Sequence, residues 1–104
     1  MVFRSAMTSS GEQKVGQSTN PSGAVVTLYG CAACGARLWG ENDQRPGMAT
    51  LRCGTLDRSV ELEPVVHLWV RSRQAWIAIP EHATRLDEQP RSNEEWLALL
   101  GPKA

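Results

Sequence analysis

The sequence has 104 residues, of which 41% are hydrophobic and 21% charged, and its eleven basic side chains balance its eleven acidic ones. This length allows one domain with a modest core. Because no basic block stands out, the charge pattern gives no reason to expect nucleic acid or an anionic membrane as a partner. No apolar run approaches the about 20 residues that a membrane-spanning helix requires.

The cysteine content and the first residues bear on the cellular compartment. The chain has three cysteines, an odd and low count that argues against a secreted domain stabilised by disulfides. The N-terminal residues are polar and lack the apolar stretch of a secretory signal. We therefore expect a cytoplasmic protein whose thiols are reduced.

Runs rich in β-branched and aromatic residues, separated by Gly, Pro, Asn and Asp, predict a series of β-strands. The strongest run is Val65–Val70, which is apolar on both faces except at His67. Residues 48–53 alternate between apolar and polar side chains, as expected for a strand with one buried face. In chain order, strands are expected over residues 6–9, 14–18, 25–29, 37–41, 48–53, 65–70 and 76–80.

One helix is expected, at the C-terminal end of the chain. Ser92 and Glu95 fit a capping box, in which the serine caps the first turn and the glutamate reaches back. An apolar stripe over residues 96–100 follows, and Gly101-Pro102 ends the helix. The sequence thus predicts a single, mainly β domain over residues 1–104, with antiparallel strands and one short C-terminal helix.

The most informative motif is Cys31-Ala-Ala-Cys34-Gly35, which has the spacing of a zinc knuckle. Two intervening residues let both thiolates reach one ion, and Gly35 can adopt the positive φ that such a turn requires. A closed structural site needs about four ligands, so Cys31 and Cys34 form half a site. A redox pair would need a strand-to-helix junction, whereas a strand is expected after Cys34. The remaining alternative is a turn that binds nothing.

The other candidate ligands have simpler interpretations. Cys53 lies on the apolar side of its predicted strand, so we expect a small buried side chain. His67 is expected to be a hydrogen-bonded core residue, although it is the better site candidate of the two histidines. His82 is expected in a polar, solvated loop. The tryptophans are expected to supply the bulk of the core; they are Trp39, Trp69, Trp76 and Trp96.

Several segments together resemble one family. Tyr29 to Trp39 is similar to the family's F-C-x-x-C-G-x-x-L-W segment, and Gly54-Thr55-Leu56-Asp57 to its G-T-L-D turn. Further similar segments, matching the family's P-x-x-H-I-W, P-W-I, S-G-E and S-G patterns, are Pro64 to Val70, Ala75-Trp76-Ile77, Ser10-Gly11-Glu12 and Ser22-Gly23. The chain thus resembles, over nearly its whole length, the glutathione-dependent formaldehyde-activating enzyme family, also called the centromere protein V-like family.

The resemblance implies a β-tent fold, zinc, and carbon–sulfur lyase chemistry on glutathione–formaldehyde adducts. Family members hold a structural zinc with an early C-x-C pair and a late C-x-x-C pair, and a second zinc with a C-H-C-x-x-C segment. No cysteine precedes Cys31 in this sequence. Only Cys31 and Cys34 therefore carry over, as structural zinc ligands, and the catalytic residues are unknown. The expected domain is an N-terminally truncated member of the family.

Three interpretations follow from the sequence. The chain is a lyase by descent that needs another polypeptide to supply the missing segment, and whether it is itself an enzyme stays open. Alternatively, it is a non-catalytic zinc-binding β-domain, in which two copies pool Cys31 and Cys34 into one site of four thiolates. The third possibility is a remnant that folds poorly, because lost strands would expose sheet edges.

Overall fold

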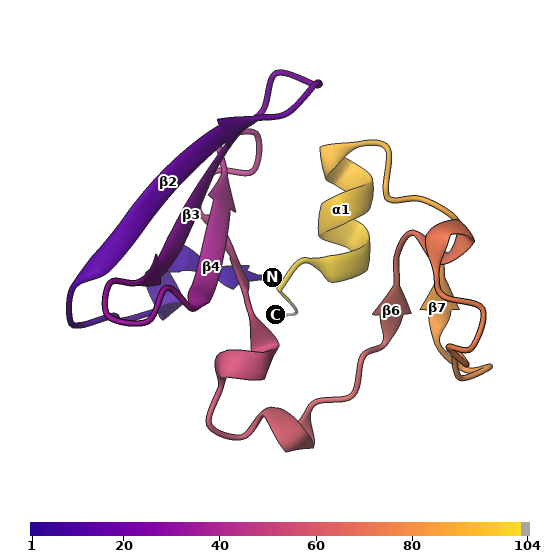
Figure 1. The fold of residues 1–104 in the computed structure, drawn as a ribbon. Helices are drawn as coiled ribbons and strands as arrows, with labels where there is room; N and C mark the ends of the chain where they lie inside the picture. Colours follow the sequence, from indigo (N-terminus) through magenta and orange to yellow (C-terminus); the bar gives the residue numbers. More distant parts are fainter. Residues whose placement is uncertain (103–104) are drawn as a thin grey trace.

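A five-stranded antiparallel sheet forms the N-terminal part of the computed structural model, which describes residues 1–102 (Figure 1). The spatial order of its strands is β1-β5-β4-β3-β2. These strands are β1 (Val2–Phe3), β2 (Gln13–Thr19), β3 (Val25–Cys31), β4 (Arg37–Asn42) and β5 (Met48–Leu51). No helix within residues 1–102 combines the length and the apolar character needed to cross a membrane.

Tight turns connect the central strands. Between β2 and β3, the Asn20 amide donates to the Ala24 carbonyl at 2.8 Å, and the Gly23 amide donates to the Asn20 carbonyl at 2.9 Å. Gly23 has a φ of +88°, a conformation that costs glycine little because it has no Cβ. The pairing register then runs from Thr19 opposite Val25 to Gln13 opposite Cys31. The hairpin therefore holds Cys31 at the end opposite its turn.

The main packing feature of the sheet is a stack of side chains on β3 and β4. Trp39 is only 3% exposed, and its ring lies against that of Tyr29, with centroids 4.4 Å apart and an interplanar angle of 9°. The Arg4 guanidinium covers the Trp39 ring at 5.4 Å from its centroid. The Trp39 Nε1–H donates to Glu41 at 3.2 Å. An aromatic pair of this kind adds about 0.5–1.5 kcal/mol beyond its burial.

The C-terminal part contains the two-stranded sheet of β6 (Val66–His67) and β7 (Thr84–Arg85), followed by α1 (Asn93–Leu100). The helix begins as predicted, because the Ser92 hydroxyl accepts from the Glu95 amide at 3.1 Å. The Glu95 carboxylate accepts from the Arg91 amide at 2.8 Å. The fold class is therefore confirmed as mainly antiparallel β with one short helix, although β6 and β7 pair in parallel.

Three strand predictions are wrong. No strand forms over residues 6–9, where the 3-10 turn Arg4–Ala6 ends and irregular chain follows, and none forms over residues 76–80, which are a turn residue and irregular chain. The run 65–70 is a strand only at Val66–His67, because Trp69 turns the backbone at a φ of +55°. Its amide donates instead to the Glu88 carbonyl at 2.7 Å. A bulky residue in this left-handed region is strained, so long-range backbone bonding overrides the local strand preference.

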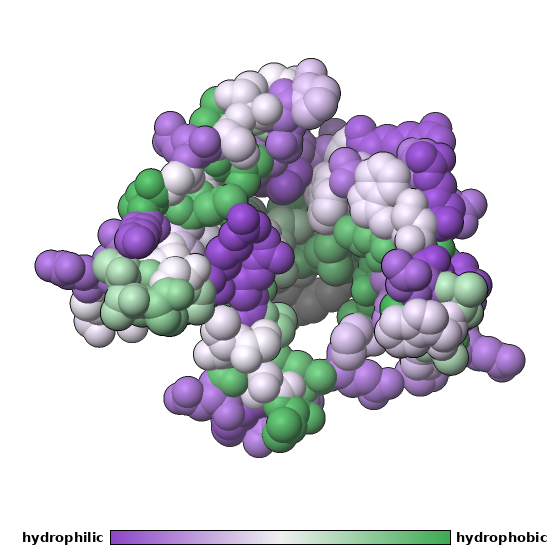
Figure 2. All heavy atoms as spheres, in the orientation of Figure 1, coloured by the Kyte–Doolittle hydropathy of each residue, from purple (hydrophilic) through white to green (hydrophobic). Residues whose placement is uncertain are grey.

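The core is smaller than the tryptophan content predicts. Of the four tryptophans only Trp39 is buried; Trp69 is 43% and Trp76 81% exposed, and Trp96 is partly buried. The buried hydrophobic residues are otherwise small, namely Ala24, Ala49, Val70 and Ala83. The radius of gyration is 14.9 Å, against about 13 Å for a compact chain of 100 residues. Figure 2 shows the consequence, a hollow between the sheet and the C-terminal part with hydrophobic atoms on its walls.

Truncating a buried and an exposed tryptophan tests where the stability of the fold originates. We expect Trp39→Ala to lower the free energy of unfolding by about 3–5 kcal/mol, because it leaves a cavity and removes the Tyr29 stack. Trp76→Ala, the matched control at 81% exposure, should stay within about 0.5 kcal/mol of the wild type. Chemical denaturation measures both; equal effects would contradict the central role of Trp39.

Candidate metal centre

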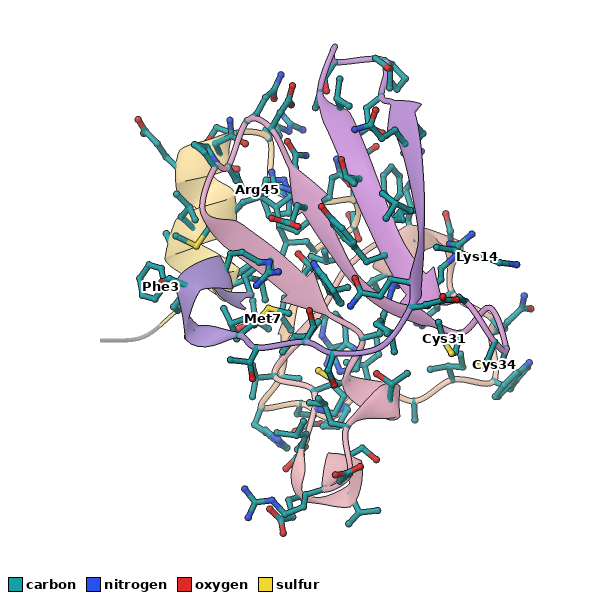
Figure 3. The ribbon with its side chains drawn as sticks, turned by 90° about the vertical axis from the view of Figure 1, so that its left-hand side faces the viewer. Phe3, Met7, Lys14, Cys31, Cys34 and Arg45 are labelled. Atoms are coloured by element: carbon teal, nitrogen blue, oxygen red, sulfur yellow. The ribbon has the colours of Figure 1, made fainter. Side chains whose placement is uncertain are left out.

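Cys31 and Cys34 lie together in the turn that connects β3 to β4, at one end of the sheet (Figure 3). Cys31 is the last residue of β3 and is partly buried, whereas Cys34 is exposed. Ala32, Ala33, Gly35 and Ala36 are the other residues of the connection between the strands. All four have small side chains.

Backbone hydrogen bonds close this turn. The Cys31 amide donates to the Ala36 carbonyl at 2.8 Å, and the Gly35 amide donates to the Cys31 carbonyl at 2.8 Å. Gly35 has a φ of +75°, which confirms the left-handed conformation predicted for it. A Cβ at Gly30 would lie 3.1 Å from the Ala36 carbonyl oxygen, so a larger residue there would have to displace this backbone. The two glycines on either side of the cysteines therefore favour this turn.

The same turn stabilises the thiolate form of Cys31. Hydrogen bonds from the backbone N–H groups of Cys34 and Ala33, and from the Cys34 thiol, lower the pKa of Cys31, and desolvation opposes them only in part. The two cysteines are three positions apart in one closed turn, so their side chains lie at the same end of the sheet. A thiolate is the form that binds metal. The arrangement can therefore supply two adjacent thiolate donors.

Other ligand types do not join these cysteines within the described chain. Among residues 1–102, no group of three or more His, Cys, Asp and Glu side chains is arranged to hold a metal ion. The prediction that Cys53 is buried is wrong: it is exposed, because β5 ends at Leu51 and Cys53 opens a 3-10 turn. His82 is exposed as expected, and its Nε2 lies 3.2 Å from Glu63.

His67 does not have the hydrogen bond that the sequence led us to expect. It lies partly buried on β6, and its Nε2 has no partner among the described residues. Its backbone carbonyl accepts from the Leu86 amide at 2.9 Å. The structure thus does not bring His67 into the cysteine turn as a ligand.

The surroundings of Cys31 were not predicted from the sequence. A hollow of about 380 Å³ lies beside it, lined by the turn and by residues 10–13 of the N-terminal segment. The Ala32 amide donates to the Glu12 carbonyl at 3.3 Å and joins the two segments. This contact continues the β2–β3 register by one residue beyond the pair Gln13–Cys31, so it depends on the pairing of the hairpin and not on the residues around the cysteines.

The sequence model of the glutathione-dependent formaldehyde-activating enzyme family matches residues 1–72. The chain belongs to this family. The match includes the whole five-stranded sheet and the cysteine turn, whereas β7 and α1 lie beyond it. Comparisons with curated proteins and with solved structures returned no match. Membership of the glutathione-dependent formaldehyde-activating enzyme family therefore rests on the sheet and the turn.

The lowered pKa of Cys31 has a measurable consequence. In the reduced, metal-free chain, we expect iodoacetamide to alkylate Cys31 with a pH midpoint below that of the denatured chain. The folded turn stabilises the thiolate, so deprotonation occurs at lower pH, and unfolding removes the backbone donors. Mass spectrometry of the peptide containing Cys31 gives the rate at each pH. Equal midpoints in the folded and denatured chains would contradict this account.

Proposed function

We propose that this chain is a zinc-binding domain of its family, in which Cys31 and Cys34 provide half of a structural four-thiolate site. The observation that carries the proposal is the turn itself, where backbone and thiol hydrogen bonds favour the Cys31 thiolate next to Cys34. Structural zinc sites use cysteine pairs of this spacing and need about four ligands in tetrahedral geometry. Zinc bound there would fix the turn and the ends of β3 and β4.

The donor set distinguishes this role from that of a catalytic zinc centre. A catalytic zinc in this family needs a further cysteine cluster, and the sequence has only Cys53 besides the pair. Cys53 is exposed at the end of β5, and its thiol lies 3.9 Å from the Leu51 carbonyl. The residues present fit half of a structural site and do not fit a catalytic one, so no catalytic step through zinc is derived for this chain.

We infer that a second copy of the chain supplies the other two thiolates. The turn projects from the end of the β2–β3 hairpin, and Cys34 is exposed. Only alanine and glycine flank the cysteines within the turn, so two turns can approach without steric conflict. An isologous contact brings identical half-sites together about a two-fold axis. A cytoplasmic location, with reduced thiols, is consistent with this role.

Zinc content and molar mass together test this proposal. We expect about one zinc per two chains, in a dimer, by elemental analysis and light scattering, because four thiolates would share one ion. Cys31→Ser should lower the zinc content and the melting temperature together. Cys53→Ser, the matched control, should leave both unchanged. Unchanged zinc content in Cys31→Ser would exclude the turn as the metal site.

The second candidate function is the activity that gives the family its name. The match over residues 1–72 favours it, and the hollow beside Cys31 offers space for a ligand. In that case the chain would act on glutathione–formaldehyde adducts as a carbon–sulfur lyase. It would do so only where a segment outside this sequence supplies the cysteine cluster of a catalytic zinc.

The purified chain is expected to show no glutathione-dependent formaldehyde turnover by itself, because its donor set cannot hold a catalytic zinc. The assay follows adduct formation or loss in the presence of zinc, with an active member of the family as the positive control. Turnover by a homogeneous, zinc-loaded preparation, absent from Cys31→Ser, would overturn the structural interpretation and establish the lyase.

A further inference from the structure

A second hollow, of about 420 Å³, lies at the other end of the β2–β3 hairpin, remote from the cysteine turn. It is enclosed by the turn after β2, the loop after β4 and the start of α1. The hollow lies at the start of β3, whereas Cys31 is the last of the seven residues of this strand. The two ends of such a strand are about 20 Å apart. It therefore shares no residue with the proposed zinc site.

Arg45 is the central group of this hollow. Its Nη1 donates to the Asn93 side chain at 3.0 Å, and its guanidinium lies 4.9 Å from the centroid of the Trp96 ring. The residue is partly buried, and desolvation lowers its pKa without an acidic neighbour to compensate. In Figure 3, Arg45 lies between the sheet and α1, far from Cys31 and Cys34. The guanidinium is thus held in place by a ring and an amide.

No carboxylate balances this charge within residues 1–102. Arg45 forms none of the ion pairs there, and no Asp or Glu side chain lines the hollow. Glu41 and Asp43 line neighbouring hollows together with Arg45. The Glu41 carboxylate is engaged by Arg4 at 3.8 Å and by Trp39 at 3.2 Å, and the Asp43 carboxylate accepts from the Val25 amide at 2.9 Å. A partly buried cation normally has a carboxylate or anion as its partner.

The remaining lining groups are hydrogen-bond donors or neutral side chains. They include the carboxamides of Asn20, Asn42, Gln44 and Gln89, a second guanidinium at Arg91, and the Ser22 hydroxyl. Guanidinium and amide groups are the usual partners of carboxylate and phosphate oxygens. The arrangement is therefore cationic and rich in donors, and it contains no competing anion.

We propose that this hollow binds an oxyanion, a carboxylate or a phosphate group, with Arg45 as its main contact. The N–H groups of Arg45 that do not contact Asn93 would donate to two oxygen atoms of the anion, while Trp96 and Asn93 hold the guanidinium plane in place. The carboxamides around it would donate to the remaining oxygens. The site does not depend on zinc, and it joins the family-matched sheet to α1.

Titration of the full chain with inorganic phosphate and, separately, with acetate tests this proposal. We expect saturable shifts of the backbone amide NMR signals of Asn20, Ser22 and Asn93. Saturable binding of either anion supports the site, and the tighter anion identifies the class of ligand. Shifts that do not saturate, or that are spread over exposed arginines such as Arg37 and Arg58, would overturn it.

A charge variant makes the test specific to the hollow. Gln89→Glu keeps the oxygen that accepts from the Trp69 Nε1–H at 3.3 Å and adds a negative charge to the lining. It should weaken binding by about tenfold or more, because like charges at this range repel. Gln74→Glu adds the same charge outside the hollow and should change the affinity less than about twofold. Equal effects of both variants would indicate only non-specific attraction and would overturn the proposal.

A second variant protects the test from effects on folding. Arg45 also links the sheet to Asn93 and Trp96, so its removal would act on packing as well as on binding. Ser22→Asp instead places a carboxylate at an exposed turn position that tolerates aspartate. Retained phosphate affinity in a folded Ser22→Asp chain, shown by an unchanged melting temperature, would contradict the proposed site.

Discussion

The packing of Trp39 against Tyr29 is the interaction on which the rest of the sheet depends. It joins the two strands that carry the cysteine turn, and Trp39 is the one large side chain that is buried among residues 1–102. Arg4 lies over the tryptophan ring and pairs with Glu41 at 3.8 Å. The start of the chain is thereby attached to β4. The aromatic pair consequently holds together the strands before and after the cysteine turn, whose own geometry is set by backbone hydrogen bonds.

The two candidate sites differ in charge and occupy opposite ends of one hairpin. The cysteine turn favours negative thiolates, because backbone N–H groups point at the Cys31 sulfur. The hollow at the other end favours anions from outside, because Arg45 has no carboxylate partner there. A single rigid element, β3, separates them. Each site can therefore be altered or occupied without direct electrostatic interference from the other, since about 20 Å exceeds the screening length at physiological salt.

Local sequence patterns predicted the parts of the fold that local forces determine. The hairpin strands have β-branched and aromatic residues between glycine turns, Ser92 caps α1, and Gly35 adopts its positive φ. The strand predictions failed at residues 6–9 and between residues 65 and 80, where the chain turns at Trp69 and its amide bonds to the Glu88 carbonyl. Arg45 was not predicted as a site residue, because its environment arises from segments 48 residues apart. The burial expected for Cys53 failed because β5 ends at Leu51, and Trp69 and Trp76 are exposed in the region where the expected strands do not form.

The contact between the ends of the chain has a consequence for its connectivity. The Met1 amino group donates to the Leu100 carbonyl at 3.0 Å, so the N-terminus adjoins the last turn of α1. Residues 52–65 connect the two sheets without a strand or an α-helix, and most of them are exposed. Two distant positions that meet, combined with an exposed connection elsewhere, are the conditions under which circular permutation is tolerated. The order of the sheet and the C-terminal part along the chain is therefore interchangeable in principle: a short linker could lead from the end of α1 to Met1, and new ends could be opened within residues 52–65.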